Sequence, residues 1–90
     1  MVSALKITIT GRVQGVFFRV ETKKFAAALG ITGWVYNTDD GKVEIHAEGK
    51  ESVLEKLKEW CKKGPPSANV EKVIFKNTSE EHFTSFEIRR

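Results

Sequence analysis

The chain has 90 residues, of which 40% are apolar and 30% are charged, and its formal net charge is +3. This length predicts one domain spanning residues 1–90, and this composition excludes a disordered chain and favours a globular domain with a small core. No apolar run approaches the roughly 20 residues that cross a bilayer, and MVSALKITIT at the start has no basic segment followed by an apolar block. We therefore expect no membrane partner and no secretory signal. The single cysteine, Cys61, cannot form an internal disulfide, which suits a cytoplasmic protein.

The first half of the chain alternates between strand and helix patterns. Residues 4–13 alternate apolar and β-branched polar side chains, which predicts a half-buried strand. Glycines at 11 and 15 break this pattern, and from Phe18 apolar residues recur at helical spacing until Gly30, a suitable stop. Residues 31–37 and 42–48 predict two strands joined by a turn that ends in Asp-Gly, a hairpin signal. The alternation in 42–48 predicts Val43, Ile45 and Ala47 facing inward and Glu44, His46 and Glu48 facing outward.

The second half predicts one more helix and two more strands. Residues 50–63 carry an apolar stripe, with acidic residues early and lysines late, and Gly64-Pro65-Pro66 ends the helix. Residues 70–76 predict a strand, 77–82 a polar turn, and 83–89 a last strand with Phe86 and Ile88 inward.

The resulting order is β-α-β-β-α-β with one extra strand. Each helix follows a strand and has one apolar face, so both should cover the same face of a mainly antiparallel sheet of four to five strands. This predicts an α+β fold, the ferredoxin-like sandwich, with strand order 4-1-3-2.

The loop before the first helix has the chemistry of an anion site. The start of a helix presents about four backbone N–H groups without helical partners and roughly half a positive charge. Gly15 lets a ligand approach the backbone closely, because no Cβ stands in the way. Arg19 in the first turn is unfavourable against the helix dipole unless an anion accompanies it, and a phosphate would accept a two-pronged guanidinium contact. The alternative is that Arg19 is solvent-exposed or pairs with a carboxylate such as Glu21.

Several blocks of the chain resemble the acylphosphatase family. They are GRVQGVFFR at 11–19, GWVYN at 33–37, DGKVE at 40–44, GPPS at 64–67 and FEIR at 86–89, so the resemblance covers nearly the whole chain. Family members have a ferredoxin-like fold, which agrees with the pattern of strands and helices.

The resemblance implies a function and a site. It implies a hydrolase that splits the carboxyl-phosphate bond of an acyl phosphate and releases inorganic phosphate, the expected product inhibitor. It further implies a phosphate cradle, which we call the cradle loop, made by the backbone amides of Gln14, Gly15, Val16, Phe17 and Phe18. By the same resemblance, Arg19 binds the phosphate with its side chain, and Asn37 orients the attacking water.

Two positions depart from the family's pattern, and one assigned residue has a simpler interpretation. Position 17 is Phe where many members carry Gly. Position 36 is Tyr where a basic residue is frequent, which would weaken recognition of the outer part of the substrate. Spacing alone favours a turn-entry asparagine at Asn37, and only the family resemblance favours the water-orienting role.

The residue inventory suits an acyl phosphate better than a phosphate monoester. Monoesters need up to about 10²¹-fold acceleration, often supplied by a covalent nucleophile or two metal ions. We expect neither, and no cofactor: Cys61 falls on an apolar helix stripe, His46 and His82 have no partners at metal-ligand spacing, and Asp39-Asp40-Gly41 is typical of a turn. An acyl phosphate has a carboxylate leaving group, whose conjugate acid has a pKa near ~4–5, so it departs without a general acid.

Three other classes of protein share this βαββαβ architecture. RNA-binding modules stack bases on aromatic residues of the third strand, but KVEIHAEG at 42–49 has none, so we expect no nucleic acid partner. A metal chaperone would need a Cys-x-x-Cys pair, which is absent from the sequence. A domain that binds phosphate or carbamoyl phosphate without hydrolysis could keep the same loop and arginine, and it stays open. We expect a monomer that acts on a small-molecule acyl phosphate.

Overall fold

A computed structural model describes residues 2–89 of the chain. The elements follow the predicted order, with one short strand added at the end. They are β1 (Val2–Arg12), α1 (Phe18–Ala28), β2 (Thr32–Asn37), β3 (Val43–Lys50), α2 (Glu51–Lys63), β4 (Asn69–Thr78) and β5 (Phe86–Ile88).

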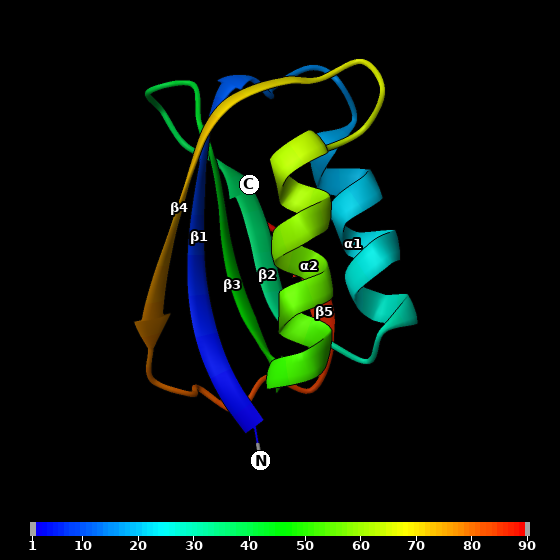
Figure 1. The fold of residues 1–90 in the computed structure, drawn as a ribbon, viewed down its shortest axis with the longest axis vertical. Coiled ribbons are helices and arrows are strands. Elements are labelled where there is room, and N and C mark those ends of the chain that lie inside the picture. The colour runs from blue at the N-terminus through cyan, green and yellow to red at the C-terminus, as the bar shows by residue number, and fades with distance from the viewer. Residues whose placement is uncertain (1, 90) are drawn as a thin grey trace.

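The five strands form one mixed sheet in the order β4-β1-β3-β2-β5. Neighbours pair antiparallel, except that β5 runs parallel to β2 at the edge. Both helices lie side by side against one face of this sheet (Figure 1). The predicted ferredoxin-like fold and the order 4-1-3-2 are confirmed, and the extra strand is now placed beside β2.

The core lies between the helices and the sheet. The inward positions of β1 and β3 are fully buried because alternate residues of a strand face the same side. Phe18 and Leu57 bury the helix faces against them, and the ring of Phe18 meets Trp60 edge-on, with centroids 5.4 Å apart. Phe18 is therefore both the first residue of α1 and a core anchor, so packing holds the start of this helix firmly in place.

His46 and Glu48 face outward from the core, as predicted, but they are not exposed to solvent. Both lie on the face away from the helices, yet they are only 3% and 4% exposed. The segment between β4 and β5 folds over them: the carboxylate of Glu48 accepts a hydrogen bond from Phe83 N–H at 3.2 Å and another from Glu81 N–H. His46 Nε2 lies 2.7 Å from the same carboxylate. The alternation predicted the face correctly, but it could not show a later segment covering that face.

Two boundaries in the second half also differ from the prediction. β4 continues to Thr78, because its pairing with β1 extends to Ala4, so the predicted turn at 77–82 begins two residues later. The last strand covers Phe86–Ile88 instead of 83–89. Phe83 donates its N–H to Glu48 and not to a neighbouring strand, which explains why pairing starts late.

Candidate active site

The loop from β1 to α1 makes a tight turn at one end of the sheet. Gly15 has a φ of 73°, and Phe17 has φ 63° and ψ 20°, so both lie in the left-handed region. Loops with successive N–H groups in such conformations form concavities that bind anions. α1 begins directly afterwards at Phe18, so the loop leads into the positive end of a helix dipole.

The backbone donors of this loop are not used by the protein. Among residues 2–89, no acceptor is bonded to the N–H of any residue from 15 to 20. The first helical bond runs from Glu21 N–H to the carbonyl of Phe17 at 3.0 Å, and Phe17 makes no side-chain cap. These N–H groups are therefore available to a ligand at a helix start that favours negative charge.

A pocket of about 330 Å³ opens at the same place. It brings together the cradle loop, the first turn of α1 and the end of β2. Its lining residues are Val13, Gly15, Phe17, Phe18, Arg19, Val20 and Asn37. Two of the predicted cradle residues, Gln14 and Val16, are not in this lining, because Val16 is 5% exposed in the core and Gln14 has other partners.

Arg19 lines the pocket without a protein partner for its charge. In the part of the chain that the structure describes, its guanidinium makes no ion pair and no hydrogen bond. Glu21, the carboxylate considered as its partner, instead pairs with Lys24 at 3.5 Å. A half-buried cation at a helix start, with no carboxylate beside it, leaves the pocket suited to an anion.

Asn37 closes the pocket from the end of β2. Its Oδ1 is buried and has no hydrogen-bond partner among the described residues. A buried carbonyl oxygen without a partner costs about 1–3 kcal/mol, so such atoms in native proteins call for an explanation. A bound water or ligand donor in the pocket would satisfy this oxygen.

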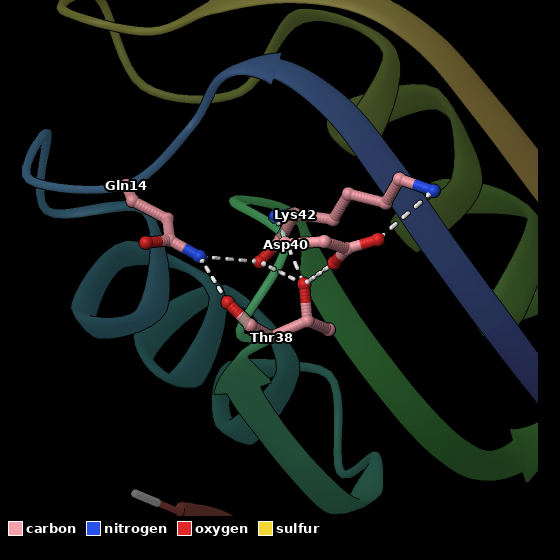
Figure 2. Close-up of polar contacts among 4 residues, drawn as sticks. All are labelled: Gln14, Thr38, Asp40 and Lys42. Atoms are coloured by element: carbon pink, nitrogen blue, oxygen red, sulfur yellow. Dashed lines mark hydrogen bonds and ion pairs between the residues drawn. The ribbon is translucent and has the colours of Figure 1, made fainter.

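The side chain of Gln14 ties the cradle loop to the β2–β3 turn (Figure 2). Its Nε2 donates to the carbonyl oxygens of Thr38 at 2.8 Å and Lys42 at 2.9 Å. Thr38 follows Asn37 directly, so this contact links the loop to the strand end that carries Asn37. No sequence pattern indicates this contact, since the acceptors are backbone carbonyls 24 and 28 residues away.

The turn that receives Gln14 is itself cross-linked, as the sticks in Figure 2 show. Thr38 Oγ1 accepts from Lys42 N–H at 2.9 Å and donates to the carboxylate of Asp40. Asp40 also pairs with Lys42 Nζ at 3.4 Å. The hydrogen bond from Thr38 lowers the pKa of Asp40, with Lys42 adding to the effect. Asp40 therefore acts as a turn residue, as its Asp-Gly context predicted.

The other chemically active side chains lie away from this pocket. Cys61 is fully buried in the core, as predicted, and burial raises the pKa of its thiol. Within residues 2–89 no three His, Cys, Asp or Glu side chains are grouped to hold a metal ion. None of the helices in the same range is long and apolar enough to span a membrane.

Comparisons with known proteins agree with this geometry. The family model described as Acylphosphatase matches residues 5–88. An acylphosphatase of Acaryochloris marina is 49% identical over 86 residues, covering 96% of this chain and 92% of that protein. One from Thermotoga maritima is 46% identical over 86 residues, 96% of each chain. The crystal structure of acylphosphatase from Bacillus subtilis superposes with a TM-score of 0.95 at 38% identity, over the whole of both chains.

The fold and the pocket together define a ferredoxin-like domain with an open candidate anion site at the start of its first helix. Within that class, the chain belongs to the acylphosphatase family. It is a hydrolase of acyl phosphates, since similarity to curated acylphosphatases extends over nearly the whole length of both partners.

Proposed function

We propose that the pocket binds the phosphoryl group of an acyl phosphate between the cradle loop and Arg19, and that Asn37 holds the attacking water. The observation that carries this proposal is the set of unused donors. Among the described residues, the N–H groups of residues 15–18 have no protein acceptor. Gly15, Phe17 and Phe18 line one pocket together with Arg19, whose guanidinium is unpaired in the same part of the chain. Backbone amides and a guanidinium are strong ligands for phosphoryl oxygens. Placed around the phosphoryl group, they stabilise the charge that spreads over these oxygens during transfer.

Asn37 supplies the second half of the mechanism. Its buried Oδ1 needs a donor, and a water in the pocket would donate one of its hydrogens to it. The water oxygen would then attack phosphorus while the bond between phosphorus and the acyl oxygen breaks. The carboxylate leaves unprotonated, because its conjugate acid is much stronger than water.

The proton of the attacking water goes to a phosphoryl oxygen of the substrate in this mechanism. Asn37 is a neutral amide and cannot act as a strong base. Among the described residues that line the pocket there is no carboxylate or imidazole to take the proton. A steep pH dependence of the chemical step near neutrality, assigned to a protein side chain, would contradict this route.

The test is the release of phosphate from benzoyl phosphate by variants at the two proposed residues. Arg19→Ala should lose about 10²- to 10³-fold in kcat/KM and should no longer be inhibited by inorganic phosphate. Lys23→Ala removes an exposed cation from the same helix and should behave as wild type. Arg19→Ala with normal kcat/KM and normal phosphate inhibition would remove this residue from the site.

Asn37→Ala should separate turnover from binding. It should lower kcat by about 10²-fold, because a water that is not held in line reacts far less often, while phosphate inhibition changes little. Asn77→Ala, an exposed asparagine on β4, is the matched control. Near-normal kcat in Asn37→Ala would show that the water is positioned by another group.

A binding domain without turnover is the second candidate, because such a domain would keep the same loop and arginine. Phosphate binding without measurable release from benzoyl phosphate would favour it. A cytoplasmic location, a monomeric state and the lack of a nucleic acid partner stay predictions. The location is supported by the buried thiol of Cys61.

A further inference from the structure

Two large apolar side chains stand at the mouth of the candidate active site. Within residues 2–89, four large apolar residues are exposed: Val2, Phe17, Val20 and Ile74. Phe17 is 74% exposed and Val20 is 42% exposed, and both line the pocket that contains Arg19 and Asn37. Single exposed apolar residues are common, but half of this set gathers at one functional pocket.

Phe17 contributes little to the stability of the free protein. Its φ of 63° places a bulky residue in the left-handed region that favours glycine, so its backbone conformation is unfavourable. Because three-quarters of its surface is exposed, its ring recovers little of that cost by packing. A strained and exposed residue at a pocket points to a role in the bound state.

The positions of these residues match the place where an acyl group must lie. If the phosphoryl group is held by the N–H groups of the cradle loop and by Arg19, the acyl group must extend from it toward the mouth of the pocket. Phe17 directly precedes α1 and Val20 lies in the first turn of that helix, and both line the same pocket. Among the described lining residues, Arg19 is the only charged one, so the mouth has no second charge to bind a polar acyl group.

We infer that Phe17 and Val20 form an apolar platform for the acyl group, and that the enzyme prefers acyl phosphates with large apolar or aromatic acyl groups over those with an acetyl or carbamoyl group. This inference rests on the proposed function. A ring contact that buries on the order of 50 Å² of apolar surface changes affinity by about three- to tenfold.

The experiment compares kcat/KM for benzoyl phosphate and acetyl phosphate. Phe17→Asn keeps a residue that tolerates the left-handed conformation and removes the ring, and Val20→Ala shortens the second side chain within the helix. Each variant should lower the ratio of benzoyl to acetyl kcat/KM, by about three- to tenfold for Phe17→Asn and about twofold for Val20→Ala. Ile74→Ala removes an exposed apolar side chain from β4 and should leave the ratio unchanged.

The outcomes separate the two proposals. If the wild type hydrolyses both substrates and the ratio is unchanged in both variants, the platform is wrong and the proposed function stands. If the wild type hydrolyses neither, both fail. Since the ratio is measured within each variant, a general loss of activity in Phe17→Asn cannot imitate the expected result, and Val20→Ala gives an independent reading that does not disturb the loop.

Discussion

The contact between Gln14 and the β2–β3 turn makes a sharp prediction about how the candidate site is held together. In Gln14→Met the side chain keeps its length but loses the donor that serves the carbonyls of Thr38 and Lys42, at 2.8 Å and 2.9 Å. A neutral hydrogen bond contributes about 0.5–1.5 kcal/mol net, so two contribute about 1–3 kcal/mol. Both bonds are only part-buried, and each carbonyl keeps a backbone donor, Thr38 N–H for Lys42 and Gly41 N–H for Thr38. We therefore expect the lower half of that range, about 1–2 kcal/mol.

The expected change in stability is large enough to measure. For a domain of this size, 1 kcal/mol shifts Tm by about 4–8 °C, so Gln14→Met should melt roughly 5–15 °C lower than the wild type. Urea denaturation should show a lower midpoint with an unchanged m-value. The matched control is Lys62→Met, which removes an exposed contact to Glu59 on α2, at 2.7 Å, and should cost at most about 0.5 kcal/mol.

Turnover should fall by more than the loss of folded protein explains. Gln14 precedes Gly15 of the cradle loop, and Thr38 follows Asn37. In the proposed mechanism, this contact would therefore set the separation between the phosphoryl group and the attacking water. A displacement of about 1 Å can cost about 10²-fold, and we expect at least a tenfold loss of kcat with benzoyl phosphate at a temperature where the variant is folded. Gln14→Met with a wild-type urea midpoint and wild-type kcat would refute the reasoning.

Three further predictions concern the parts of the molecule that carry the site. Burial opposes ionisation of Glu48, but the hydrogen bonds from Glu81 N–H, His46 and Phe83 N–H outweigh it and lower the pKa of this carboxyl. Its contribution to stability is therefore present above the ordinary glutamate pKa of 4.5 and is lost as the pH falls below it, and acid denaturation of Glu48→Gln should lack this component. In Gly33→Ala the new Cβ would lie 1.8 Å from the carbonyl oxygen of His46, so urea denaturation should show that the free energy of unfolding falls by more than about 3 kcal/mol. The control Gly30→Ala is also at positive φ but in open space, and its free energy of unfolding should fall by about 1–2 kcal/mol. Equal losses in the two variants would contradict the clash. EDTA should leave the hydrolysis of benzoyl phosphate unchanged, because a carboxylate leaving group needs no metal; activity restored only by added metal would contradict this.

The fold was predictable because its determinants are local and periodic. The period-two alternation of β1 and β3 and the helical spacing after Phe18 each select one secondary structure, and the βαββαβ order then leaves few topologies. The position of β5 was not predictable, because three residues carry almost no pattern. The burial of His46 and Glu48 was missed for a different reason: it depends on backbone N–H groups of Glu81 and Phe83, which every sequence possesses.

In the candidate site too, features that depend on side-chain type were predictable from the sequence, whereas features that depend on the course of the backbone were not. A glycine-containing loop before a helix, followed by Arg19, left an anion site and a solvent-exposed arginine both open, and the family resemblance selected the anion site and added Asn37. The structure places Arg19, Gly15 and Asn37 on one pocket. The sequence could not reveal that the side chain of Gln14 hydrogen-bonds to the β2–β3 turn. It also could not reveal that Phe17 has a left-handed backbone conformation and an exposed side chain. Both facts follow from where the backbone goes. The core residue Phe18 fixes the start of α1. In the proposed mechanism, the loop residues before Phe18 contribute backbone N–H groups to the phosphoryl group, whereas Arg19 after it contributes its side chain.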